Sequence, residues 1–386
     1  MEDLSYLTQY ATVRQLEYIE AITRLGSHNK AAKELNIGRR VIDKSMSQLK
    51  FKASRQGLSP QHDMIHAVPE GFNVKGVSTY YDDEGKVRGQ WVKTTASAEN
   101  AEKVREAFVE AMKDDLPRFE SIRKNVITEA ALLNVFVYGD PHIGMRAWAE
   151  ETGENHDLAL AEGLFTAAHE DLVKRAPAAS TAIILNLGDY YHADDGRNIT
   201  LRSGHNLDVD GRYQKVRKVG FRILRRMIDM TLERHDQVIV WNIPGNHDDF
   251  SAIDLSLWLE IAYEKEPRVQ VDTNPSKFYF YRHGKTMLAA THGDTVKPDQ
   301  MLGVMASDKA EMWGLTSFRY AHIGHVHSKT LKDLPGLAVE THRVLQPSDL
   351  WAYNKGYRSQ RDATCITYHM DHGEYARTVV NPSCIS

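Results

Sequence analysis

The sequence predicts an α/β fold with a small all-α domain in front of it. The early part of the chain shows helical periodicity, with apolar residues three and four positions apart. From Asn134 onward, short apolar runs alternate with helical patterns, which is typical of α/β domains. Several of these runs end in Gly, Asp, Asn or His, at the position where open α/β sheets carry their chemistry.

Length and composition restrict the class of protein. A chain of 386 residues has room for one large domain and one small domain, and 42% hydrophobic with 26% charged residues is a globular composition. No apolar run approaches a membrane span, so we expect no membrane association. The N-terminal residues lack a secretory pattern, and Cys365 and Cys384 form no disulfide framework, so we expect a cytoplasmic protein.

The first domain is predicted over residues 12–53, after a loose tail. One helix begins near Val13 and ends at Gly26, and Ser27 is an expected N-cap for a short second helix. A tight turn at residues 36–38 precedes a third helix that begins at Arg39. This order of helices and turn is the helix-turn-helix layout. Residues 1–11 are predicted to be the loose tail.

The third predicted helix carries cations and amides on its exposed side. Cations can bind phosphates and amides can read base edges, so this surface is typical of a recognition helix. Because the formal net charge is −4, any DNA binding must come from such a local patch. The alternative is a three-helix module for packing or dimerisation. The predicted DNA-binding residues are Arg39, Arg40, Lys44, Gln48 and Lys50.

Residues 54–130 are predicted to be a linker that contains a β-hairpin and a helix. The hairpin is expected over residues 74–93 with its turn at 82–85, and the helix over residues 98–112.

Residues 131–386 are predicted to form the large α/β domain. Its main helices are expected over residues 156–174 and 213–233. The expected strands cover residues 135–138, 182–185, 238–241, 278–280, 287–290 and 320–323.

Five polar motifs follow apolar runs in this domain, and the central one is Gly-Asn-His-Asp at residues 245–248. Their side chains are oxygen and imidazole donors without a thiolate, a set that suits Mn²⁺, Fe²⁺ or Zn²⁺. Seven donors exceed the need of one tetrahedral ion and suit two ions that share a carboxylate. The candidate metal ligands are Asp140, His142, Asp189, Asn246, His292, His325 and His327.

The order of these motifs resembles the calcineurin-like metallophosphoesterase superfamily over residues 134–328. The resemblance implies a sheet sandwich flanked by helices and two divalent ions, with Mn²⁺ expected first and Fe²⁺, Zn²⁺ or Mg²⁺ as alternatives. It also implies a phosphoesterase in which a bridging hydroxide attacks the phosphorus. One ion would be held by Asp140, His142 and His327, the other by Asn246, His292 and His325, and Asp189 would bridge both.

The same resemblance implies three catalytic residues. His247 would face the phosphate and stabilise the transition state or protonate the leaving oxygen, and Asp248 would orient His247. His192, three residues after Asp189, is similar to a histidine of the SbcD-type nuclease branch that contacts the substrate phosphate. The alternative for His192 is an ordinary surface histidine.

These features together predict a DNA nuclease that hydrolyses phosphodiester bonds. One alternative is a phosphomonoesterase or a cyclic-nucleotide phosphodiesterase with a regulatory DNA-binding module. Another is a DNA-binding regulator with an inactive enzyme domain. The aromatic and cationic segment 351–358 is expected to pack across a sheet edge, with substrate contact as the alternative. The oligomeric state is not readable from the sequence.

Overall fold

The computed structural model describes residues 4–55, 58–59, 64–65, 72–81, 87–96, 122, 124, 126–200 and 203–385. The chain divides into two compact units, Met1–Phe108 and Val109–Ser386. The helix predicted over residues 98–112 and the hairpin turn at 82–85 lie outside the described residues. The domain limits predicted after residues 53 and 130 stay predictions.

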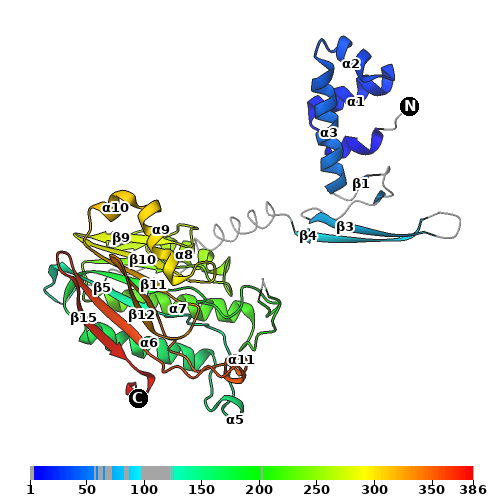
Figure 1. Ribbon diagram of the computed structural model, residues 1–386. Coiled ribbons are helices and arrows are strands. Elements are labelled where there is room, and N and C mark those ends of the chain that lie inside the picture. Colours follow the sequence, from blue (N-terminus) through cyan, green and yellow to red (C-terminus); the bar gives the residue numbers. More distant parts are fainter. Residues whose placement is uncertain are drawn as a thin grey trace. The chain divides into compact units, whose positions relative to one another are not determined.

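Among its described residues, the N-terminal unit has three α-helices over the ranges that the sequence indicates (Figure 1). They are α1 (Val13–Leu25), α2 (His28–Glu34) and α3 (Arg39–Arg55). Thr12 and Gln15 form a capping box at the start of α1, and Gly26 ends that helix in the left-handed conformation. The side chain of Ser27 accepts the amide of Asn29 and caps α2.

The prediction of a loose tail before α1 is wrong. Residues Ser5–Tyr10 form a 3₁₀ helix, η1, and the side chains of Leu4 and Leu7 are buried. They pack in the same apolar cluster as Ile42 and Met46 of α3. In a 3₁₀ helix, residues three apart lie on one face, so both leucines reach the core together.

Two antiparallel strand pairs, one short and one long, follow in this unit. Strand β1 (Leu58–Ser59) pairs with β2 (Met64–Ile65), and β3 (Phe72–Tyr81) pairs with β4 (Val87–Ala96) over the predicted hairpin.

The C-terminal unit is built on two sheets. In spatial order, the six-stranded sheet consists of β15 (Gly373–Val380), β14 (Ala363–His369), β5 (Glu129–Tyr138), β6 (Ala179–Asn186), β7 (Gln237–Asn242) and β8 (Val269–Val271). The five-stranded sheet consists of β12 (Thr330–Leu334), β13 (Leu337–Thr341), β11 (Phe318–Ile323), β10 (Thr286–Thr291) and β9 (Tyr279–His283).

Helices cover the outer faces of both sheets. All helices described in the C-terminal unit, including those that do not cover a sheet, are α5 (Ala149–Thr152), α6 (Leu158–Arg175), α7 (Tyr213–Leu232), α8 (Ser251–Ala262), α9 (Met301–Asp308), α10 (Ala310–Gly314) and α11 (Leu350–Asn354), with 3₁₀ turns η3 (Pro298–Gln300) and η4 (Pro382–Cys384). Within the described part of the chain, no helix combines the length and apolar character needed to cross a membrane.

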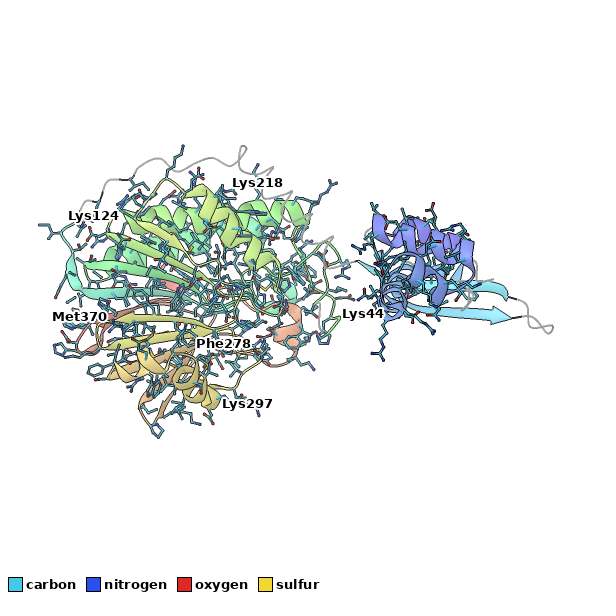
Figure 2. All side chains as sticks on the ribbon, turned by 90° about the horizontal axis from the view of Figure 1, so that it is seen from above. Lys44, Lys124, Lys218, Phe278, Lys297 and Met370 are labelled. Carbon is cyan, nitrogen blue, oxygen red and sulfur yellow. The ribbon has the colours of Figure 1, made fainter. Side chains whose placement is uncertain are left out.

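The apolar clusters define the layers. One cluster joins the facing sides of the two sheets, for example Val135 and Leu185 with Leu288. A second packs α6, α7 and α8 on the other face of the six-stranded sheet, and a third packs α9 on the five-stranded sheet. Figure 2 shows these layers, with Lys218 of α7 on one outer side and Lys297 on the other. The predicted sheet sandwich flanked by helices is confirmed.

Strand direction decides where the polar motifs meet. Strands β5, β6, β7 and β8 are mutually parallel, and so are β10, β11 and β13. The carboxyl ends of parallel strands share one edge of a sheet. The motifs that follow β5, β6 and β7 are therefore neighbours, as are those that follow β10 and β11.

A buried ion pair connects the two sheets. Glu340 of β13 is buried, and its carboxylate accepts hydrogen bonds of 2.6 and 2.8 Å from the guanidinium of Arg377 on β15. Burial alone would raise the pKa of Glu340, but the hydrogen bonds of Arg377 lower it to about 2. Lys329 lies 3.2 Å from the same carboxylate. The sandwich thus holds a charged pair across its two halves.

Arg377→Ala should lower the free energy of unfolding by about 3 kcal/mol, because it leaves a buried carboxylate without its main partner. Because Lys329 stays beside the Glu340 carboxylate, the expected loss of stability is at the lower end of the range of about 3–5 kcal/mol for breaking a buried ion pair. Urea denaturation measures the effect. The matched control is Arg282→Ala on β9, where the side chain is exposed and the expected loss is below about 0.5 kcal/mol. Equal losses for both variants would contradict this account of the pair.

Candidate metal centre

The seven predicted ligands lie on loops at strand ends. Asp140 and His142 follow β5, Asp189 follows β6, Asn246 follows β7, His292 follows β10, and His325 and His327 follow β11. The structure brings all of them to one region of the C-terminal unit, as the contacts below show.

The backbone of five of these ligands is in the left-handed region. Their φ angles are 40° for Asp140, 45° for His142, 49° for Asp189, 66° for His325 and 52° for His327. Among the other described residues that are not glycine, only Asn36 and Asn198 have positive φ. Such a conformation costs about 1–3 kcal/mol per residue and persists where the surroundings impose it. Strain therefore concentrates on the predicted ligands.

The first set of contacts surrounds Asp140. The Nε2 atom of His327 lies 2.9 Å from Oδ2 of Asp140 and 3.4 Å from Nε2 of His142. Both carboxylate oxygens of Asp140 are buried, and neither has a hydrogen-bond partner of acceptable geometry among the described residues. The nearest groups are imidazole nitrogens, of His327 at 2.9 Å and of His292 at 3.5 Å, and a buried carboxylate is costly unless a positive charge compensates it. These three side chains therefore suit a divalent ion.

The second set surrounds Asp189. The Nε2 atom of His292 lies 3.3 Å from Oδ2 of Asp189 and 3.0 Å from Oδ1 of Asn246. Ligand atoms of Asp189, His292 and His325 all lie within 4.8 Å of one another. Nδ1 of His292 lies 2.8 Å from the carbonyl oxygen of Leu187. A ligating histidine commonly donates its second N–H in this way, so His292 is oriented as a ligand would be.

The charges of these side chains follow from the contacts between them. Burial alone would lower the pKa of His292, but the carboxylates of Asp189 and Asp140 raise it to about 10. Burial and then the imidazoles of His247 and His192 lower the pKa of His142 well below its usual range. The carboxylates thus attract positive charge, while His142 stays neutral, which is the form that binds a metal.

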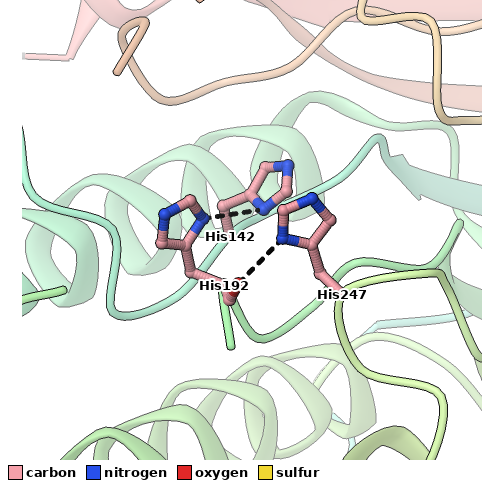
Figure 3. A group of neighbouring side chains, drawn as sticks. All are labelled: His142, His192 and His247. Carbon is pink, nitrogen blue, oxygen red and sulfur yellow. Dashed lines mark hydrogen bonds between the residues drawn. The ribbon is translucent and has the colours of Figure 1, made fainter. Parts of the chain in front are cut away.

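A second grouping places His142 beside two predicted catalytic histidines. Ligand atoms of His142, His192 and His247 lie within 4.8 Å of one another. Nδ1 of His142 lies 3.2 Å from Nδ1 of His192, and Nδ1 of His247 lies 2.8 Å from the carbonyl oxygen of His192 (Figure 3). His192 is 2% exposed, so the alternative of a surface histidine is wrong. It lies against His142 and positions His247.

The orienting role predicted for Asp248 is not observed. Its carboxylate accepts the backbone amides of Gly245 at 2.9 Å and of Asp189 and Tyr191 at 3.1 Å. The contact to the ring of His247 comes from the His192 carbonyl instead. Burial and the nearby charge of Asp189 raise the pKa of Asp248 above its usual value, and the three backbone N–H donors favour its ionised form. Asp248 therefore holds the loops together and does not orient His247.

Glycines in the motifs allow this close packing. A Cβ on Gly245 would lie 2.1 Å from Oδ1 of Asp189, and a Cβ on Gly324 would lie 2.5 Å from Oδ1 of Asp140. Each of these glycines therefore leaves room for a carboxylate that comes from a different loop. The motifs can pack closely because glycine has no side chain at the two positions where another motif places a ligand carboxylate.

The predicted DNA-binding residues lie on α3 of the N-terminal unit. Arg39, Arg40, Lys44 and Gln48 are exposed and Lys50 is half-buried; Figure 2 labels Lys44. Nε of Arg39 lies 3.3 Å from the carboxylate of Asp43. The exposed positions leave cations and an amide accessible on one helix.

Two further features of the centre come from the segment after β13: the sequence offered no motif at Gln346, and for residues 351–358 it favoured packing at a sheet edge over substrate contact. Nε2 of Gln346 donates to the carbonyl oxygen of Asp140, so a residue after β13 supports the first motif. Trp351 and Tyr357 line the same cavity, of about 320 Å³, as His142, Asp189 and His327. Neither feature carries a motif, because both depend on how a loop after β13 folds back over the strand ends.

No family model and no curated protein matches this chain. Among solved structures, it is similar to an archaeal phosphodiesterase, with 16% identity over 64% of this chain and 99% of that chain and a TM-score of 0.33. A dimetal phosphatase from Danio rerio is 9% identical over 66% of this chain and 99% of its own, with a TM-score of 0.35. Vps29 from Entamoeba histolytica complexed with zinc is 14% identical over 64% of this chain and 99% of its own, with a TM-score of 0.27.

Gly245→Ala should lower the affinity for Mn²⁺ by about 10- to 100-fold or more, because the added Cβ displaces the Asp189 carboxylate. Isothermal titration of the metal-stripped protein measures this affinity. The matched control is Gly163→Ala in α6, where a Cβ meets no atom within 4 Å. The control should bind Mn²⁺ like the unmodified chain. Normal Mn²⁺ binding by Gly245→Ala would contradict the packing described above.

Proposed function

We propose that this chain is a metal-dependent phosphoesterase that hydrolyses phosphodiester bonds in DNA. The observation that carries the proposal is the convergence of the predicted ligand groups at strand ends of both sheets, with five of them in a strained backbone conformation. Strain that concentrates on side chains with metal-binding chemistry favours a functional site over ordinary packing.

The donor set favours two divalent ions, with Mn²⁺ expected. Asp140, His142 and His327 would hold one ion, Asn246, His292 and His325 the other, and Asp189 both. Bound there, the ions would supply polarisation of a phosphoryl oxygen and activation of a water molecule. The buried carboxylate of Asp140, whose nearest groups are the imidazole nitrogens of His327 and His292, supports this assignment.

His247 is the proposed proton donor to the leaving oxygen. Its ring is half-buried, and its Nδ1 lies at hydrogen-bond distance from the carbonyl oxygen of His192. An N–H at Nδ1 would donate to that carbonyl and hold the ring in one orientation, and in the doubly protonated ring the N–H at Nε2 would carry the proton that passes to the leaving oxygen. Its amide also donates to Oδ1 of Asp189 at 2.8 Å, so the residue is fixed to the centre at two points.

The N-terminal unit is the proposed DNA-binding part. The exposed Arg39, Arg40 and Lys44 on α3 suit phosphates, and Gln48 suits a base edge. Ser27 caps α2, and Asn36 in the left-handed conformation forms the turn after it, so α3 begins as a separate helix. A DNA-binding unit on the same chain as a phosphoesterase centre favours a phosphodiester in DNA as the substrate.

Asp189→Ala should reduce metal-dependent DNA cleavage by about a thousand-fold or more, because the shared carboxylate is lost. Metal-stripped protein is incubated with end-labelled single- and double-stranded DNA and Mn²⁺, Mg²⁺ or EDTA, and the products are separated on a denaturing gel. The exposed Asp299→Ala serves as the control and should cleave normally. Intact DNA beside hydrolysis of a small phosphomonoester would instead favour a phosphomonoesterase.

Arg39→Ala with Arg40→Ala should weaken DNA binding and reduce its dependence on salt, because two phosphate contacts are lost. The plot of log binding constant against log salt concentration has a negative slope, and the size of that slope should decrease by about 2. Hydrolysis of bis-(p-nitrophenyl) phosphate should not change. Lys30→Ala with Lys33→Ala removes two exposed cations from α2 and is the matched control. If the arginine variant binds DNA as the control does, α3 is not the recognition helix.

A further inference from the structure

A cavity of about 320 Å³ extends from the candidate metal centre to an aromatic wall. One side of the cavity is lined by ligand side chains, including Asp189, Asn246 and His327. Another side is lined by Trp351, Tyr357 and His205. Cavities that bind small organic groups begin at about 300 Å³, so one nucleotide-sized group is the appropriate scale.

Local structure holds the aromatic wall in place. The carboxylate of Asp349 accepts the amide of Ala352 at 2.8 Å and caps α11, which carries Trp351. Gly356 follows with a φ of 83°, and the amide of Tyr357 donates to the carbonyl of Ala352 at 3.1 Å. This left-handed turn brings Tyr357 back onto Trp351.

The rings of the wall are stacked and accessible. The centroids of Trp351 and Tyr357 lie 5.9 Å apart with an interplanar angle of 25°. His205 lies 6.4 Å from Trp351 at 35°. Despite this contact, Trp351 is 51% and Tyr357 43% exposed. The sequence favoured packing of these rings across a sheet edge. Instead, a capped helix holds them beside the cavity, and they stay partly exposed.

The wall is tied directly to the centre. Gln346 precedes the capped helix, is 1% exposed, and donates through Nε2 to the carbonyl of Asp140. Its Oε1 is buried and has no hydrogen-bond partner among the described residues, and Gln346 itself lines the cavity. Gly139 also forms a bridge with Val344. The segment that carries the rings is therefore anchored on the motif that supplies Asp140.

We propose that Trp351 and Tyr357 form a stacking subsite for one unpaired nucleobase beside the phosphate that is cleaved. This inference rests on the proposed function and specifies its substrate as single-stranded DNA or a frayed end. In a duplex the faces of the bases are covered by their neighbours, so a ring outside the helix cannot stack on them. An unpaired base exposes its face, and stacking on aromatic side chains is insensitive to sequence.

The test uses a short single strand of thymidine with one central abasic residue, in Mn²⁺. Cleavage at each phosphate is compared with that at the same phosphate of the intact strand. The unmodified chain should cut beside the abasic residue about 5- to 100-fold less, because one stacked base is missing. Trp351→Ala should lose most of this discrimination, and Trp351→Phe, which keeps an aromatic face, should retain most of it.

Tyr375→Ala is the control, since it removes an aromatic side chain that is 60% exposed on β15 and does not line the cavity. It should show the full discrimination. The proposal is overturned if Trp351→Ala discriminates like the unmodified chain, or if the unmodified chain ignores the abasic residue. In both cases DNA is still cleaved and only the subsite fails. If the unmodified chain cleaves no DNA but hydrolyses small phosphoesters, the proposed nuclease fails as well.

Discussion

The candidate centre depends on the hydrogen bonds that the buried carboxylate of Asp248 accepts. This carboxylate accepts amides from Asp189 and Tyr191 after β6 and from Gly245 after β7. These hydrogen bonds fix two loops that no strand pairing joins. They also fix the backbone of Asp189, whose φ of 49° is unfavourable for an aspartate. A buried polar group with all its partners satisfied specifies one arrangement of its neighbours.

The centre is correspondingly assembled from parts that fit only together. Ligands from one loop occupy the space beside a glycine of another, as Asp189 does at Gly245 and Asp140 at Gly324. The sandwich supplies the frame, because parallel strands bring the loops of each sheet to one edge. Side chains arranged in this way need little reorganisation to receive cations, which is the condition for effective electrostatic catalysis.

The sequence predicted the parts of this architecture that depend on local patterns. Strands β5, β6 and β7 and helices α6 and α7 lie where apolar periodicity placed them, and the ligand motifs lie at their ends. What it missed depends on contacts between distant segments. The burial of Leu4 and Leu7 depends on α3, two of the three partners of Asp248 come from another loop, and the position of Trp351 follows from the anchoring of Gln346 on Asp140. Residue type and spacing do not encode such contacts.

The most direct test of the central claim is anomalous X-ray diffraction from crystals of the chain grown with Mn²⁺. The account predicts two anomalous peaks per chain, one contacted by Asp140, His142 and His327, the other by Asn246, His292 and His325, with Asp189 in contact with both. A single peak closed by four protein ligands, or no peak at these residues, would contradict a two-metal centre.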